Sequence, residues 1–187
     1  MVSIRSLFTS AVAMMALPVM GAVTPQQIAG TLKDITDLSL KLQKPAQAIT
    51  IVNAPLIIIG QGPFPELIKG FTEIVTVATT TISQFPGTPQ ITSEADGTLV
   101  FDSFRAFVSV HQQLLNILIG KAGILTQIPL VGAPVAAVLR SVEGVVDSIA
   151  IFLINTVETR AKDLTYEANS LGNTLDLTIQ KYQGLQI

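Results

Sequence analysis

The sequence predicts an all-α protein, an antiparallel bundle of about five helices with no disulfides. Apolar residues recur at steps of three and four along most of the chain, which is the spacing of one helix face. No stretch alternates between apolar and polar residues for long enough to build a sheet. The 187 residues include no cysteine, so a packed core has to supply the stability.

The N-terminal segment 1–22 has the layout of a secretory signal peptide. Arg5 supplies a positive charge, Leu7–Met20 is mostly apolar, and small residues follow it. A buried first helix or a membrane anchor would also be apolar, but this run is short for a membrane-spanning helix. We therefore expect a single domain over 23–187 that is secreted, extracellular or associated with the cell wall. We expect no transmembrane segment in this mature chain.

The first helix of the mature chain begins at Thr24, which can cap it, and Pro25 suits the first helical position. Gln27 can complete a capping box with Thr24. Pro45 is expected to break or kink the helix, and the stripe resumes at Ile49 and Val52. The stripe before the proline consists of Ile28, Leu32, Ile35, Leu38 and Leu42.

A Pro/Gly-rich connection, Asn53–Pro65, surrounds the apolar patch Leu56–Ile59 and leads into a second helix that runs to Ile82. Threonines within 76–81 lower helix propensity, and a strand is the alternative for 74–82. The three-four spacing of the apolar residues favours the helix. The threonines then form its polar face or carry O-linked sugar, and partial burial in a helix favours the first interpretation.

After a Pro/Gly breaker at 85–89 and a polar loop to Gly97, the spacing predicts a third helix over 99–119. Apolar residues cover more than half of its circumference, so it should be buried on most sides. A short helical piece and a loop occupy 120–134.

The last two helices are expected over 135–153 and 160–182, the second closed by Gly184. Short links imply that helices consecutive in the chain run in opposite directions. The stripe of the fourth helix consists of Val135, Val138, Leu139, Val142, Val145, Val146, Ile149, Phe152 and Leu153.

The composition argues against nucleic-acid binding and against catalysis. Only 13% of residues are charged and the net charge is −2, which does not suit a nucleic-acid partner. His111 is the one histidine, so a zinc site is improbable, and no Gly-x-Ser-x-Gly motif is present. We expect the protein to have no enzymatic activity and to bind no metal ion and no cofactor. His111 is either a hydrogen-bonded histidine of the core or its boundary, or a polar contact for a ligand head group.

The second half of the chain has the helix lengths and spacing of a known family. Its markers are Leu114–Lys121, an apolar turn with a Gly/Pro break, Val135–Leu139, Phe152–Leu153 and Ile179–Tyr182. This layout resembles the fungal hydrophobic surface-binding protein A family, also called the cell wall galactomannoprotein family. The first half matches more loosely, and the whole resemblance spans roughly 24–182.

The resemblance implies a secreted or wall-associated fungal protein with a five-helix bundle. Family members bind hydrophobic surfaces or enclose fatty acids such as arachidonic acid, and some are antigens. The sequence shows no Ser/Thr-rich stalk and no anchor signal, which wall-anchored members carry, so we do not expect covalent attachment to the wall.

Together these observations predict a lipid-binding protein, with a fatty acid held between the helices. The residues expected to line the ligand are Phe71, Val75, Phe104, Val108, His111, Leu115, Leu139, Val142, Val146, Ile149, Leu171 and Leu175. Small residues beside the stripes would leave room for it: Ala78, Ala106, Ala136, Ala137, Gly144, Ala150 and Ala168. Candidate donors to the carboxylate are Arg105, His111, Gln112, Ser141 and Tyr182.

Two alternatives remain open from the sequence. A surface-active adhesin would use exposed patches at Leu56–Ile59 and Ile128–Val131 to coat hydrophobic surfaces or the cell wall. A ligand-free structural or antigenic wall protein would use the same stripes as ordinary core.

Overall fold

The structure, a computed structural model, describes residues 22–125, 128 and 131–183 and confirms the all-α prediction. The predicted signal segment up to residue 21 and the predicted closing Gly184 lie outside these residues. The described helices are α1 (Pro25–Ala48), α2 (Pro63–Ile82), α3 (Glu94–Leu125), α4 (Gly132–Thr156) and α5 (Ala161–Gln183), with short 3-10 helices η1 (Ala54–Ile59) and η2 (Glu158–Arg160). None of these helices is long and apolar enough to span a membrane.

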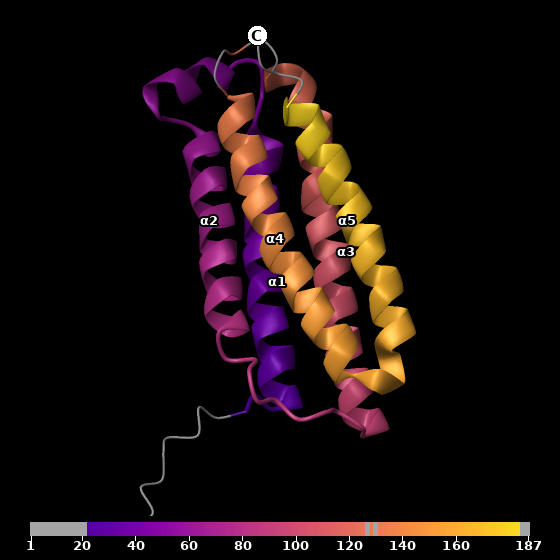
Figure 1. Ribbon diagram of the computed structural model, residues 1–187. Coiled ribbons are helices and arrows are strands. Elements are labelled where there is room, and N and C mark those ends of the chain that lie inside the picture. The colour runs from indigo at the N-terminus through magenta and orange to yellow at the C-terminus, as the bar shows by residue number, and fades with distance from the viewer. Residues whose placement is uncertain (1–21, 126–127, 129–130, 184–187) are drawn as a thin grey trace, which may run out of the picture.

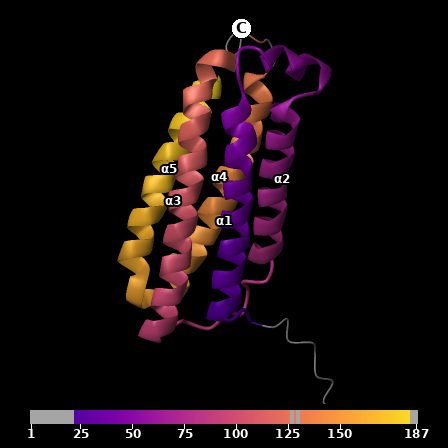
Figure 2. The same cartoon turned by 180° about the vertical axis from the view of Figure 1, so that it is seen from behind.

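The five long helices form a closed ring around one hydrophobic core (Figure 1). Around the ring the order is α1, α3, α5, α4 and α2, and α2 returns to α1, as the reverse view also shows (Figure 2). Consecutive helices of the chain run in opposite directions, as the short links predict. Because five is odd, this alternation cannot continue around a ring, and some spatial neighbours must be parallel.

Helices α1 and α3 are one such parallel pair, and hydrogen bonds fix their register. Near the start of both helices, Gln26 Nε2 donates to Asp96 Oδ1 over 3.2 Å. Half-way along, Ser39 Oγ lies 2.8 Å from His111 Nδ1, so the sequence offset stays near 70 residues. Helix α5 runs parallel to α3 on its other side, where Tyr182 Oη donates to the Leu118 carbonyl over 2.9 Å.

The predicted capping box opens α1. Gln27 N donates to Thr24 Oγ1 over 3.2 Å, and Thr24 N donates to Gln27 Oε1 over 2.8 Å. Pro45 lies inside the helix without ending it. The predicted continuation to Val52 is wrong, since α1 ends at Ala48 and Val52 is 89% exposed. Asn53 explains the end, because its Nδ2 donates to the Ala48 carbonyl over 2.7 Å.

Thr24→Ala should lower the free energy of unfolding by about 1 kcal/mol, because it removes the side-chain acceptor of the first turn of α1. Urea unfolding followed by circular dichroism measures the change. Thr165→Ala is the matched control, since this exposed threonine bonds only to a carbonyl within α5. An equal loss in both variants would contradict the capping role.

Helix α3 begins at Glu94, so the predicted loop through Gly97 is wrong. The Ser93 carbonyl accepts from Gly97 N over 2.9 Å, and acidic residues in the first turn suit a helix N-terminus. Gly97 serves close packing there, because a Cβ would lie 2.5 Å from Thr159 Oγ1. Helix α3 also extends to Leu125, beyond its predicted end, and α2 begins at Pro63, two residues earlier than expected.

The threonine-rich part of α2 is helical, and the strand alternative is wrong. The hydroxyls of Thr72, Thr76 and Thr80 each donate to the carbonyl four residues earlier. All three residues are exposed, so they form a polar face whose hydroxyls are satisfied within the helix.

Candidate functional site

The predicted lining residues meet inside the ring. All except Val75 are buried, and Val75 packs against the same core from α2. Their side chains come from α2, α3, α4 and α5. The sequence-based set omits α1, whose buried face adds a fifth wall. That wall consists of Ile28, Ala29, Leu32, Ile35, Ser39, Leu42, Pro45 and Ala46.

His111 is the principal polar group of this interior. It is 0% exposed, and its ring centroid lies 5.3 Å from that of Phe107 and 6.2 Å from that of Phe71. Its Nδ1 contacts Ser39 Oγ on α1. Its Nε2 is buried and has no hydrogen-bond partner among the described residues. The imidazole therefore presents one unsatisfied position to an otherwise apolar and aromatic environment.

Burial lowers the pKa of His111 from 6.5 to about 4, so the ring is neutral at pH 7. Ser39 Oγ also lies 3.0 Å from the Ile35 carbonyl, and its single hydrogen can serve only one of these acceptors. If it bonds to Ile35, His111 Nδ1 carries the ring proton and Nε2 is an acceptor. If it bonds to Nδ1, Nε2 carries the proton and is a donor. Either tautomer suits one oxygen of a carboxyl group.

The other four candidate donors have partners or face solvent. Gln112 Nε2 donates to the backbone and a hydroxyl of α5, and Tyr182 Oη donates to α3. The side chain of Arg105 is 66% exposed and pairs with a glutamate of α5, and exposed Ser141 bonds within α4. Among the five predicted donors, His111 alone combines full burial with an open position.

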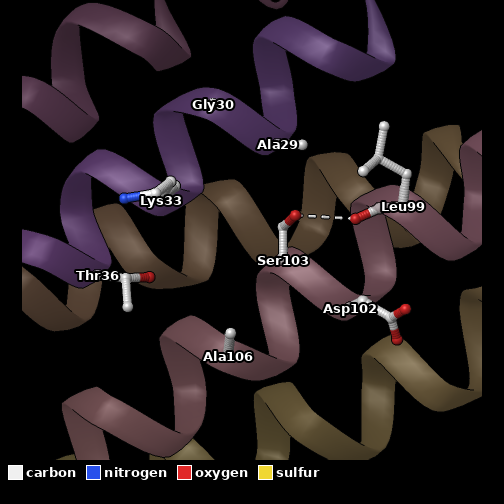
Figure 3. A pocket seen from close by; sticks show the side chains of 8 residues that line it. All are labelled: Ala29, Gly30, Lys33, Thr36, Leu99, Asp102, Ser103 and Ala106. Carbon is white, nitrogen blue, oxygen red and sulfur yellow. Dashed lines mark hydrogen bonds between the residues drawn. The ribbon is translucent and has the colours of Figure 1, made fainter.

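A second candidate site is an open groove of about 470 Å³ between α1 and α3 (Figure 3). Its size lies in the range of small-molecule sites, and its lining is mostly apolar. Lys33 stands at its edge, where Nζ lies 2.6 Å from Asp37 Oδ2. None of the twelve predicted residues lines it. The lining consists of Ala29, Gly30, Lys33, Thr36, Leu99, Asp102, Ser103 and Ala106.

The two predicted surface patches differ in exposure. Ile58 is 70% exposed and Ile59 65% exposed, and they lie in η1, which is capped by Gly60 with a φ of 70°. Ile128 and Val131 belong to the hydrophobic core, so their predicted exposure is wrong. Between them, Pro129 and Leu130 lie outside the described residues.

No metal site is evident where the structure describes the chain, since no three histidine or acidic side chains gather there. The one notable carboxylate pair joins α4 and α5. Burial, together with a hydrogen bond to Asp176, raises the pKa of Glu143 above its usual range.

The fold matches two solved structures. Ligand-binding domain 1 of the Penicillium marneffei MP1 protein, complexed with arachidonic acids, gives a TM-score of 0.70 at 15% identity, covering 82% of this chain and 94% of that domain. AFMP4P in complex with palmitic acid gives a TM-score of 0.64 at 15% identity, covering 84% of this chain and 99% of its own. No protein-family profile and no curated sequence matches the chain.

These likenesses define the class of fold, a five-helix bundle also found in fatty-acid complexes. At 15% identity, the two similar structures establish the fold of this chain and do not establish its ligand.

Proposed function

We propose that this protein binds a long-chain fatty acid between its helices, with the carboxyl group at His111 Nε2. The observation that carries the proposal is that Nε2 is fully buried and has no partner in the part of the chain that the structure describes. A buried polar atom without a partner costs about 1–3 kcal/mol and calls for an explanation. A carboxyl oxygen would satisfy it in either tautomer.

The surrounding residues favour an aliphatic ligand. An acyl chain of about sixteen carbons would bury methylenes worth about 0.8 kcal/mol each, or about 12 kcal/mol before the costs of association. The five walls of the ring are lined by aliphatic and aromatic side chains. Small outward movements of the helices would let the chain replace contacts between opposite walls. The fatty acids in the two similar structures support the same ligand class.

We also propose that the protein is secreted and acts outside the cell, at or near the wall. This rests on the sequence of segment 1–22 and on the family resemblance. The adhesin alternative keeps support from the exposed isoleucines of η1, whereas the burial of Ile128 and Val131 removes its second patch.

Native mass spectrometry with added palmitic acid tests the binding. The wild-type protein should gain the mass of the ligand. His111→Leu should weaken binding at least about tenfold, because a hydrogen bond to a charged group is worth about 1.5–3 kcal/mol. The same substitution should narrow the preference for palmitic acid over its methyl ester, since the ester lacks the charged oxygen.

Gly30→Leu separates the interior from the surface groove. A Cβ at Gly30 meets nothing within 4 Å, so a larger side chain can start there without a clash, and it would narrow the groove. We expect binding to be unchanged in this variant. Loss of binding in Gly30→Leu with none in His111→Leu would place the ligand in the groove. Absence of any mass gain in the wild type would refute fatty-acid binding.

A further inference from the structure

Charge is unevenly distributed along the bundle. We define the basic end as the last nine residues of α1, α3 and α5 with the first nine of α2 and α4. Six basic side chains lie there against two acidic ones, Glu66 and Asp176. The remaining described residues carry four basic and eleven acidic side chains. The basic residues are Lys41, Lys44, Lys69, Lys121, Arg140 and Lys181.

Helix dipoles do not account for this asymmetry. Three helix C-termini and two N-termini meet at the basic end, which leaves about half a negative charge to compensate. The excess of four positive side chains is far larger. Of the three helices that end here, α5 alone has a basic residue in its last turn. Lys121 is half-buried and its Nζ donates to the Ile49 carbonyl over 2.8 Å. The other four lysines are exposed and can face an external partner.

The same end carries five of the ten exposed large hydrophobic residues in the described part of the chain. They lie in residues 51–59, which we name the apolar tip. Between Lys44 and Glu66 the chain has no charged residue. The tip is folded, since Ala54 is buried, Ile57 packs against the core, and η1 is closed by Gly60. It projects beyond the ends of α1 and α2 (Figure 1). Its exposed side chains are Ile51 65%, Val52 89%, Leu56 38%, Ile58 70% and Ile59 65%.

We propose that the basic end docks on an anionic lipid surface, with the apolar tip inserted among the acyl chains and the lysines near the head groups. Aliphatic insertion beside a cationic surface is the combination that binds such membranes. A protein partner fits less well, because the tip has no tryptophan, tyrosine or arginine, the residues that dominate protein interfaces. The tip also projects, so it offers no groove. This docking does not depend on the fatty-acid site.

Vesicle flotation tests the docking with the full-length mature chain. One set of vesicles contains phosphatidylcholine alone. The other set contains phosphatidylcholine and phosphatidylglycerol in equal amounts. The wild-type protein should prefer the anionic vesicles, and added salt should weaken this binding. Equal binding to both kinds of vesicle, or no binding to either, would overturn the proposal.

Paired substitutions separate the two parts of the surface. Ile58→Ser with Ile59→Ser should reduce binding more than tenfold, since each inserted isoleucine is worth about tenfold or more in partitioning. Ile151→Ser is the control, because Ile151 is 60% exposed near the opposite end of α4. Lys44→Glu should reduce binding to anionic vesicles at least about fivefold, whereas Lys162→Glu, in the first turn of α5 and outside the basic end, should not.

Folding and self-association are measured on the same variants. All three substituted positions and both control positions are exposed, so circular dichroism spectra should be unchanged. Sedimentation velocity should show the same monomeric species for wild type and the isoleucine variant. If the wild type is a dimer that Ile58→Ser with Ile59→Ser dissociates, the tip joins two copies of the chain and the proposal is wrong. Equal losses in the Ile151 control would also contradict it.

Discussion

Phe104→Ala should lower the free energy of unfolding by about 3–5 kcal/mol. Phe104 is 0% exposed on α3, the helix that α1 and α5 flank, and its ring centroid lies 6.2 Å from that of Phe107. Truncation removes apolar burial and leaves a cavity that rigid neighbouring helices fill only in part. Domains of this kind are stable by about 5–15 kcal/mol, so the variant would lose a large share of its stability.

Urea unfolding monitored by circular dichroism measures this effect. Tyr166→Ala is the control, because Tyr166 is also aromatic but is 74% exposed on α5. We expect a change within about 0.5 kcal/mol there. If Phe104→Ala costs less than about 1 kcal/mol, the interior of the ring is not closely packed around this side chain.

Acid should destabilise the protein between pH 6.5 and 4 through His111. The pKa of His111 is about 4 in the folded state and about 6.5 in the unfolded chain. Between these pH values the unfolded chain binds a proton at His111 and the folded chain does not. The contribution of His111 to the free energy of unfolding is therefore fully present above pH 6.5, and it is lost as the pH falls toward 4. The difference in pKa corresponds to about 3 kcal/mol when the change is complete.

His111→Leu should remove this part of the pH dependence. Urea unfolding of wild type and variant at pH 7 and pH 4.5 measures it, and the carboxylates titrate in both proteins. Glu143 acts in the opposite direction, since its raised pKa favours the folded state at lower pH, and it cancels in the comparison. An identical acid loss in both proteins would show that His111 does not titrate as a buried group.

The fold class follows from sequence periodicity, whereas several helix ends do not. The stripes predict each of the five helices, and the Thr24 capping box is visible because it is a local pattern. The start of α3 does not follow from the sequence pattern, because Gly97 resembles a loop residue. A glycine is needed at position 97 because Thr159 packs closely against it. Thr159 lies 62 residues further along the chain, so this contact leaves no local pattern in the sequence.

The walls of the candidate site were predictable in part. Buried stripes on α2 to α5 identify the lining, yet the environment of His111 depends on Ser39, 72 residues away. A signal for Ser39 exists, since it takes an apolar stripe position between Ile35 and Leu42. The α1–α3 groove has no such signal, because its exposed small residues, such as Gly30 and Ala106, look like ordinary surface.

The odd number of helices also has a mechanical consequence. Helix α1 begins at one end of the bundle and α5 finishes at the other (Figure 1). A force applied between Pro25 and Gln183 therefore acts along the helix axes. Under such a force the helices must slide past one another in shear, and many side-chain contacts are strained at the same time. In a bundle with both chain termini at the same end, the helices would instead separate one after another. Resistance to such a force is set by the unfolding rate under load, and this topology lets the whole core oppose it.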